Sequence, residues 1–461
     1  MTGDDRAGEL RVLIVTDQYE PMVGGVPTVT RELARGLAER GHAVELLAPS
    51  STGRSATATG RGASGLGADG AAGGRLTVAR RGSVRWPWYE DQRLGFLSRA
   101  AAGELIGGFG PDVVHVHSPL TLGAAARSAA RRRRVPVVYT NHYLPANVHP
   151  TADRADRAGA GRRPAAPGDP AVGSTAPATR VSAATRATAA AVGGAASSTA
   201  GALFDVGFYG YLTAFANRCD RVTAPTATAL LLLRDHGLRA PSQVVSNGVD
   251  LDVYSPGTAD ESLRARYALP AGRPLILSVG RLSPEKRADV LIEALATQDV
   301  ADTVLALAGS GPDEGRLREL AARRGVAERV RFLGFIPGTD LPGLYRLADV
   351  FAIASEAELQ SLVTMEAMAS GLPVVAVNAG ALGELVHGGE NGFLARPARA
   401  ADVAGSLDLL CRDRELRARM SKAGLRIIAD HDRHRLLARW ESIYSALAAR
   451  GSTSEEKDRQ R

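Results

Sequence analysis

Residues 355–377 read SEAELQSLVTMEAMASGLPVVAV. An apolar run precedes an acidic loop, a helix is expected from about Leu362, and a second strand covers 373–377. Strand, loop, helix and strand in this order predict one unit of a parallel α/β sheet. The helix start offers free N–H groups and a positive dipole end, which suit a diphosphate. Glu358 and Glu366 could bind hydroxyls on either side of it, or could be ordinary solvated acids.

The same alternation of short apolar runs and amphipathic stretches covers most of the chain. The protein has 461 residues, of which 45% are hydrophobic and 23% charged, the composition of a globular protein. Two series of strands and helices predict two doubly wound domains, and a helix of the first series is expected at about 92–107. Two cysteines, Cys219 and Cys411, are too few for a disulfide framework or a zinc cluster and fit a reducing compartment.

Further motifs follow one another along both series. They are Gly24-Gly25 before a helix ending LAERGH at 37–42, DVVHVH at 112–117, SNGVD at 246–250, GRLSPEKR at 280–287, AGSGP at 308–312 and VRFLG at 330–334. Together with the two acids Glu358 and Glu366, which are separated by seven residues, these motifs resemble the retaining glycosyltransferases of family GT4. The resemblance implies the GT-B fold, an α/β architecture of two doubly wound, Rossmann-like parallel-sheet domains that face a central cleft. It also implies a C-terminal helix that returns to the first domain.

The expected domain boundaries follow this pattern. Two Gly/Ala/Arg-rich stretches lack large apolar residues and are expected to be disordered insertions. The divisions are an N-terminal acceptor-side Rossmann-like domain at 1–250 with insertions at 51–74 and 146–202, a linker at 251–272, a C-terminal nucleotide-sugar-binding Rossmann-like domain at 273–430, a helix at 431–449 that packs on the first domain, and a disordered tail at 450–461.

The resemblance also implies which residues form the site. It places Arg281 and Lys286 on the diphosphate and His117 against the transferred sugar, although each residue type has an ordinary structural explanation at its position. The implied catalytic residues are His117, Glu358, Arg281 and Lys286; the implied donor-binding residues are Gly25, Arg281, Lys286, Glu358, Ser361, Leu362, Val363 and Glu366; and the implied acceptor contacts are Gly24 and His142. For His142, a plain loop histidine is an equally good interpretation.

No metal or other cofactor is expected. His115 and His117 share a strand face but have no third ligand in the sequence, and Asp250-Leu-Asp252 lies at the linker, where it is interpreted as structural. Gly24-Gly25 is not a G-x-G-x-x-G fingerprint, which argues against an NAD-dependent dehydrogenase.

The basic charge and a cluster of aromatic residues raise the question of a nucleic-acid or membrane partner. The net charge of +7 comes almost wholly from arginine, and no nucleic-acid partner is expected. A run at Arg131–Arg134 could be a solvated helix end or could contact an anionic membrane. Phe204, Phe208, Tyr211 and Phe215 share one helical face, which either faces the core or touches a bilayer. The polar start of the chain and the lack of a long apolar run predict neither a signal peptide nor a membrane span, hence a cytoplasmic protein that can lie on the inner face of the membrane.

The sequence therefore predicts a retaining, metal-independent hexosyltransferase. It would move a hexose from a nucleotide diphosphate sugar to a hydroxyl of a lipid or a small polar acceptor, with UDP-hexose favoured and GDP-mannose open. The loop Glu358-Leu-Gln360 and the segment TNHYLP at 140–145 look closer to the diacylglycerol glycosyltransferase branch than to the sucrose or glycogen branches. The alternatives are a GT-B nucleotide-sugar epimerase or phosphorylase, and a basic membrane-binding scaffold without activity.

Overall fold

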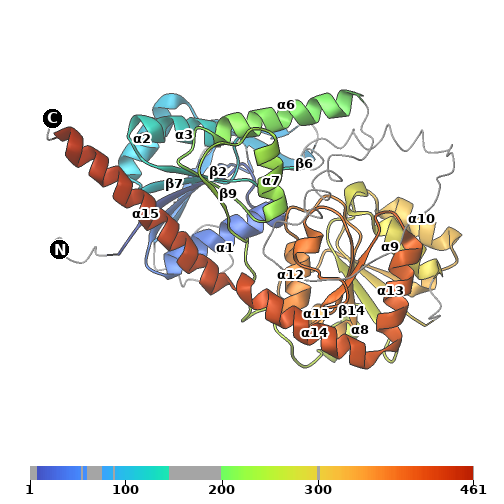
Figure 1. Cartoon of the computed structure of the whole chain (residues 1–461). Coiled ribbons are helices and arrows are strands. Elements are labelled where there is room, and N and C mark those ends of the chain that lie inside the picture. The colour runs from blue at the N-terminus through green and yellow to red at the C-terminus, as the bar shows by residue number, and fades with distance from the viewer. Residues whose placement is uncertain are drawn as a thin grey trace, which may run out of the picture.

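The computed structural model describes residues 8–52, 56–59, 75–86, 89–144, 199–297 and 302–459. The predicted insertions at 51–74 and 146–202 therefore lie mostly outside the described residues. Two α/β bodies lie side by side, and one long helix runs across both of them (Figure 1).

The N-terminal domain is built on an eight-stranded sheet. Its strands are β1 (Arg11–Val15), β2 (Ala43–Pro49), β3 (Ala56–Thr59), β4 (Leu76–Arg81), β7 (Val113–Val116), β8 (Val137–Thr140), β9 (Arg221–Ala224) and β10 (Ser242–Val244). They are arranged in the order β10-β9-β8-β7-β1-β2-β4-β3, and every pair is parallel except β3 with β4. The accompanying helices are α1 (Gly25–Glu39), α2 (Arg99–Phe109), α3 (Thr121–Arg132), α6 (Thr199–Ala216) and α7 (Ala227–Asp235).

The C-terminal domain holds a wholly parallel six-stranded sheet. Its strands are β11 (Leu275–Val279), β12 (Val304–Ala308), β13 (Val330–Gly334), β14 (Val350–Ile353), β15 (Val374–Val377) and β16 (Gly392–Ala395), in the order β13-β12-β11-β14-β15-β16. Its helices are α8 (Glu261–Arg266), α9 (Ala288–Thr297), α10 (Glu314–Arg323), α11 (Leu341–Leu347), α12 (Leu362–Ala369), α13 (Ala400–Arg412) and α14 (Arg414–Ile428), and the long C-terminal helix α15 (Arg433–Arg459) follows them. Short 3₁₀ turns are η2 (Pro284–Lys286), η3 (Ala327–Arg329), η4 (Leu382–Glu384) and η5 (Ala429–His431).

Both sheets have the doubly wound order, so each has a point where the strand order reverses. These points lie between β1 and β7 in the first sheet and between β11 and β14 in the second. In open α/β sheets, ligands bind outside the carboxyl ends of the strands at such points. The loops after β1, β7, β11 and β14 are therefore where a site is expected.

Burial explains why the strand predictions hold. The central strands are buried on both faces, and their Val, Ile, Leu and Ala side chains form much of three apolar clusters. An apolar contact helps to join the domains: Ala357 and Leu359, from the acidic loop after β14, are buried in a cluster of the first domain. The second domain thus contributes two side chains to the core of the first.

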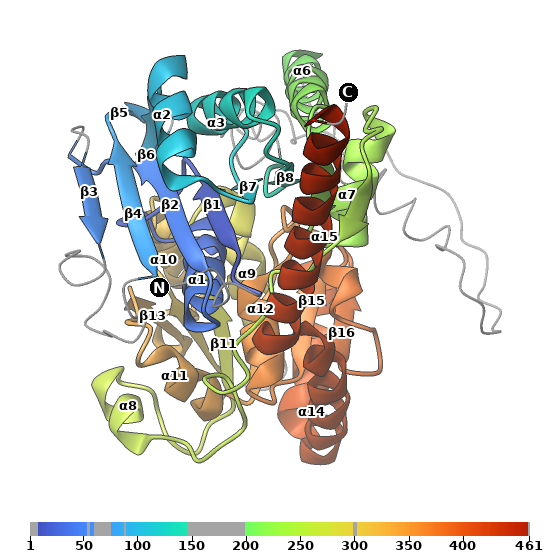
Figure 2. The same cartoon turned by 90° about the vertical axis from the view of Figure 1, so that its left-hand side faces the viewer.

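The C-terminal helix returns to the first domain, as predicted. It crosses from the second body to the first (Figure 2), and its Leu437, Trp440, Tyr444 and Leu447 are buried with β1, β2 and α1. Close packing explains the glycine at position 36, because a Cβ there would lie 2.5 Å from Leu437 Cδ1. The helix continues to Arg459, beyond the expected end at Ala449, and residues such as Glu455, Glu456 and Lys457 favour that continuation.

Two other local differences have physical reasons. The expected helix at 92–107 begins only at Arg99, where Ser98 Oγ accepts the Ala101 N–H at 3.1 Å, because the preceding residues form a hairpin of β5 (Ser83–Trp86) and β6 (Tyr89–Gly95). The expected linker at 251–272 contains α8, whose Leu263 is buried in the core of the second domain.

We predict that Tyr444→Phe lowers the free energy of unfolding by about 1–3 kcal/mol, because a buried polar atom loses its partner. The Tyr444 hydroxyl lies 2.7 Å from Nδ1 of His115, which is fully buried. Denaturant unfolding followed by tryptophan fluorescence measures this loss. Ser445→Ala, on the exposed side of the same helix, is the control, and equal stability of the two variants would contradict the prediction.

Candidate active site

The acidic loop and the start of α12 form the centre of the site. Ser361 is the N-cap of α12; its Oγ accepts the Thr364 N–H at 3.3 Å and the Thr364 hydroxyl at 2.9 Å. The next amides in the first turn, those of Leu362 and Val363, have no partner within a helix by its geometry. The positive end of α12 is therefore available to an anion, and Ser361 lies at this end as the cap.

Lys286 and Glu358 form an ion pair beside this helix start. Lys286 Nζ donates to Glu358 Oε1 at 2.6 Å, and the two side chains are 33% and 11% exposed. Burial alone would lower the pKa of Lys286, but the Glu358 carboxylate raises it above its ordinary value. Lys286 therefore stays charged, and two residues predicted from distant motifs meet at one point.

Arg287 supports the same loop and was not predicted. Its Nη1 donates to Glu356 Oε1 at 2.8 Å, and its backbone is left-handed with φ of 51°. The consecutive cations Lys286 and Arg287, directly before α9, thus form ion pairs with Glu358 and Glu356. Arg281 follows Gly280 after β11 and is largely exposed on the same edge of the sheet.

Gly380 packs against the backbone of the acidic loop. Its φ is +56°, and a Cβ there would lie 2.6 Å from the Glu358 carbonyl oxygen. The next amide, Ala381 N–H, donates to that carbonyl at 2.9 Å. The position of Glu358 therefore depends on a glycine that lies after β15.

Glu366 lies one turn into α12 against two tyrosines. Tyr345 Oη donates to Glu366 Oε2 at 2.8 Å, and Tyr254 donates to the same carboxylate. Burial raises the pKa of Glu366 to about 7, although the two hydroxyls partly offset this. A carboxylate so placed can accept hydrogen bonds from vicinal hydroxyls. Tyr254 and Tyr345 had no signal in the sequence, because their contact with Glu366 is purely tertiary.

Three loops of the first domain meet the acidic loop. A Cβ on Gly25 would lie 3.8 Å from Leu362 Cδ1, so the start of α1 faces the start of α12. The Asn247 N–H donates to Gln360 Oε1 at 2.7 Å, and Thr226 Oγ1 donates to the Leu359 carbonyl at 2.8 Å. Because these residues follow β1, β10 and β9, the carboxyl ends of the two sheets face each other.

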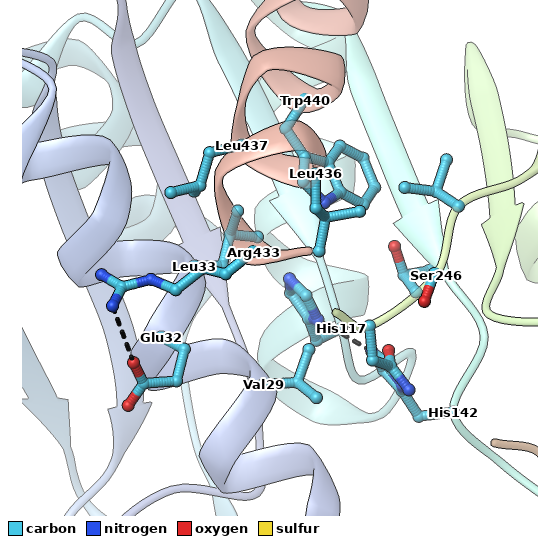
Figure 3. A pocket seen from close by; sticks show the side chains of 13 residues that line it. Val29, Glu32, Leu33, His117, His142, Ser246, Arg433, Leu436, Leu437 and Trp440 are labelled. Atoms are coloured by element: carbon cyan, nitrogen blue, oxygen red, sulfur yellow. Dashed lines mark hydrogen bonds and ion pairs between the residues drawn. The ribbon is translucent and has the colours of Figure 1, made fainter. Parts of the chain in front are cut away.

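His117 and His142 lie together at the ends of β7 and β8. The Nδ1 of His117 is 2.9 Å from the Nε2 of His142. Both line a cavity of about 30 Å³, shared with α1, the 245–247 turn and α15, in which Arg433 pairs with Glu32 (Figure 3). Burial and the neighbouring imidazoles hold the pKa of His117 well below its usual value, and burial lowers that of His142 to about 4. Both rings are therefore neutral near pH 7.

A second pocket, of about 260 Å³, lies beside the loop between β1 and α1. Its lining residues are Asp17, Tyr19, Glu20, Pro21, Met22, Pro49, Ser51, Arg85 and Arg93. Asp17 Oδ2 and Tyr19 Oη are buried without a hydrogen-bond partner in the described parts of the chain. Burial raises the pKa of Asp17 to about 7. The two arginines come from the hairpin β5–β6, which the sequence did not predict.

The acidic residues of the linker have structural roles. Asp250 Oδ1 accepts the Asp252 and Val253 N–H groups, and its Oδ2 accepts from Arg433 at 2.8 Å. Within the described residues, no three His, Cys, Asp or Glu side chains are grouped as a metal site.

The predicted residues thus form two groups. Lys286, Glu358, Leu362, Val363 and Gly25 lie around the start of α12, with Gly24 as the N-cap of α1 and Glu366 one turn further in. His117 and His142 form the other group and are hydrogen bonded to each other. Ser246 and Asn247, which line the histidine cavity, hydrogen bond to Gln360 and so connect the groups.

Two family models match the chain. The model described as Glycosyltransferase Family 4 matches residues 23–192, and the one described as Glycosyl transferases group 1 matches residues 259–426. Each model thus matches one of the two α/β domains, and the two matches together support a GT4-type glycosyltransferase. The first match includes His117 and His142, and the second includes Lys286, Glu358 and Glu366.

The curated relatives match in part. A D-inositol 3-phosphate glycosyltransferase of Nocardia farcinica is 38% identical over 221 residues, which are 46% of this chain and 48% of that protein. A protein of the same name from Salinispora arenicola is 37% identical over 256 residues, 51% of this chain and 57% of its own length. The chain thus spans about half the length of the curated relatives it matches. They support the GT4-type assignment, but not specifically the diacylglycerol branch that the sequence predicted.

Solved structures resemble the whole chain. HepE of Anabaena, in complex with UDP and glucose, has a TM-score of 0.67 at 20% identity, covering 95% of this chain and 100% of that one. Sucrose-phosphate synthase from Thermosynechococcus elongatus has a TM-score of 0.67 at 19% identity, covering 96% and 100%. The predicted GT-B fold is confirmed by these neighbours.

We predict that Glu366→Gln flattens the pH dependence of stability. The folded chain holds an extra proton on Glu366 between about pH 4.5 and 7. This contribution to stability is full below pH 4.5 and is lost as the pH rises through 7. The loss between pH 5 and 8 is on the order of 2–3 kcal/mol, and the variant should lack it.

Denaturant unfolding at a series of pH values measures the effect. Glu319→Gln, on the exposed side of α10, is the control. Identical pH profiles for the wild type and Glu366→Gln would show that Glu366 has no raised pKa.

Proposed function

We propose that the protein is a retaining, metal-independent hexosyltransferase that uses a UDP-hexose and glycosylates a hydroxyl of a polar, anionic acceptor. The observation that carries this proposal is the Lys286–Glu358 pair at the positive end of α12, at the point where the second sheet reverses its strand order. A fixed cation and free helix amides at one point are suited to a diphosphate.

The donor would lie across the start of α12. The amides of Leu362 and Val363, with Arg281 and Lys286, would bind the diphosphate, and Glu366 would accept hydrogen bonds from the ribose hydroxyls. Glu358 would bind the sugar, and His117 would face it from the first domain. UDP is favoured over GDP because structural neighbours of this fold were solved with UDP and with UDP-glucose.

The chemistry requires no enzymic nucleophile in this proposal. The acceptor hydroxyl attacks the anomeric carbon on the face that the diphosphate leaves, the carbon–oxygen bond to phosphate breaks, and a departing phosphate oxygen takes the hydroxyl proton. Arg281, Lys286 and the α12 amides would stabilise the charge that develops on the leaving group. Exclusion of water by the loop contacts between the domains would suppress hydrolysis.

The acceptor would occupy the pocket between the β1–α1 loop and the hairpin. Arg85 and Arg93 can bind an anionic group, while the unpartnered Asp17 Oδ2 and Tyr19 Oη can bind hydroxyls. The relatives' name, D-inositol 3-phosphate glycosyltransferase, fits a polyol that carries a phosphate. A free polyol phosphate and a lipid head group share this chemistry. The exposed Val84, within β5, and the exposed Phe96, directly after β6, support the lipid-linked form and contact with an anionic membrane. Among the described residues, none of the helices combines the length and apolar character that a bilayer crossing needs.

The test incubates the protein with labelled UDP-glucose, UDP-galactose, UDP-N-acetylglucosamine or GDP-mannose in the presence of a chelator. One arm adds myo-inositol phosphate, a second adds anionic lipid vesicles, and a third omits any acceptor. Transfer in either of the first two arms, with the anomeric configuration kept, supports the proposal. Transfer only after a divalent metal is added would contradict it. Conversion of UDP-N-acetylglucosamine in the third arm would instead indicate an epimerase.

Lys286→Ala should lower kcat/KM at least a hundredfold, because the leaving group loses a fixed cation. Lys422→Ala, at an exposed position on α14, is a matched control that should keep normal turnover. Steady-state kinetics of both variants tests the assignment, and normal turnover of Lys286→Ala would remove Lys286 from the site.

Arg85→Gln combined with Arg93→Gln should raise the acceptor KM about tenfold or more, since the anionic group loses its charge-assisted partners. The KM for the donor should stay within about twofold. Arg99→Gln, exposed at the start of α2, is the control. An unchanged acceptor KM would place the acceptor elsewhere.

A further inference from the structure

His117 has one ring nitrogen whose role its contacts leave open. Its Nδ1 meets His142, but its Nε2 is buried and has no hydrogen-bond partner among the described residues. A buried polar atom without a partner costs free energy, so such an atom in a native fold requires an explanation. The ring lines the cavity between α1 and α15, beside the turn that hydrogen bonds to the acidic loop.

The contact between the two histidines is an in-plane hydrogen bond. Their rings are inclined by only 8°, with centroids 5.1 Å apart. The two nitrogens are 2.9 Å apart, so the centroid separation exceeds the nitrogen separation by about the two ring radii. Face-to-face stacking would not bring Nδ1 and Nε2 together along the line of the centroids. Figure 3 shows the two side chains pointing at each other from neighbouring strand ends.

An in-plane bond between two neutral imidazoles couples their tautomers, so that two arrangements remain. Each neutral ring has one N–H donor and one acceptor nitrogen. If His142 Nε2–H donates, His117 accepts at Nδ1 and carries its own proton on Nε2. If His117 Nδ1–H donates instead, its Nε2 becomes an acceptor. The first arrangement leaves both rings protonated on Nε2, the tautomer that free imidazole side chains prefer in water.

We propose that His142 is a positioning residue that donates to His117 Nδ1 and thereby fixes His117 Nε2 as an N–H donor directed at the transferred sugar. This inference rests on the proposed function and replaces the interpretation of His142 as an acceptor contact. The strand register brings the two rings together: β7 and β8 pair with Val116 opposite Tyr139, so both histidines follow adjacent strands at the same edge. The hydrogen bond that one ring nitrogen makes decides what the other can do.

Three substitutions at position 142 separate donation from mere packing. His142→Gln keeps an N–H donor. His142→Glu has nearly the shape of His142→Gln but offers only acceptor oxygens when ionised, and His142→Leu offers neither a donor nor an acceptor. His142 is partly exposed, so the fold should tolerate all three. We expect kcat to fall on the order of tenfold to a hundredfold in His142→Leu and His142→Glu, the size of loss seen when an orienting partner is removed. His142→Gln should recover most of it. The Kd for UDP and the acceptor KM should not change.

The tautomer itself is measured on the full chain labelled with ¹⁵N-histidine. Long-range ¹H–¹⁵N correlation spectra distinguish the two tautomers, and His117→Gln identifies the His117 signals by their loss. We expect His117 to be protonated on Nε2 in the wild type and in His142→Gln, and on Nδ1 in His142→Glu. A wild-type His117 protonated on Nδ1 would overturn the proposal.

Other kinetic results would also overturn the proposal. Equal kcat values for His142→Leu and His142→Gln would reject donation, and a rise in acceptor KM at constant kcat would restore the acceptor contact. The spectra need no turnover, so they test the tautomer even if the wild type transfers no sugar, and a failure of the proposed function remains distinguishable from a failure of this inference.

Discussion

The arrangement of the site depends on the acidic loop after β14 being packed between the two domains. Ala357 and Leu359 are buried in the first domain. Glu356, before Ala357, is bound by Arg287, and Glu358, between the two apolar residues, is bound by Lys286; both cations belong to the second domain. Alternate residues of one short loop thus serve opposite purposes: the apolar ones join the domains and the acidic ones define the site. Because the loop runs into α12, the same packing fixes the direction in which the positive end of that helix points.

Sequence patterns predicted the alternating strands and helices of the two domains and the residues that lie in motifs. Strands such as β11 and β14 are buried on both faces, so they read as short apolar runs, and Glu358, Glu366 and Lys286 lie in motifs that a resemblance can identify. The hairpin β5–β6 was missed because β5 is only four residues long and the polar run of β6 has no strand alternation, and with it the arginines of the second pocket were missed. Contacts such as Tyr345 with Glu366 join separate elements, which no local pattern contains.

The two carboxylates of the site have different environments, and their chemistry differs accordingly. Glu358 faces a lysine, whereas Glu366 faces two neutral hydroxyls and is held near its point of titration. Pairing stabilises the charge of one, and burial opposes the charge of the other. The histidines on the opposite side add no charge, since burial keeps them neutral. The positive charge at the proposed phosphate position therefore comes from Arg281, Lys286 and the start of α12, and Glu358 offsets that of Lys286.

The return of α15 to the first domain also has a consequence for synthesis. Trp440, Tyr444 and Leu447 belong to the core of β1, β2 and α1, yet they leave the ribosome after the whole second domain. Domains generally fold as units while the chain emerges, N-terminal first. Here the second domain can complete its core before the first can, so the nascent first domain keeps an open apolar groove between α1 and the sheet until the last helix arrives to fill it.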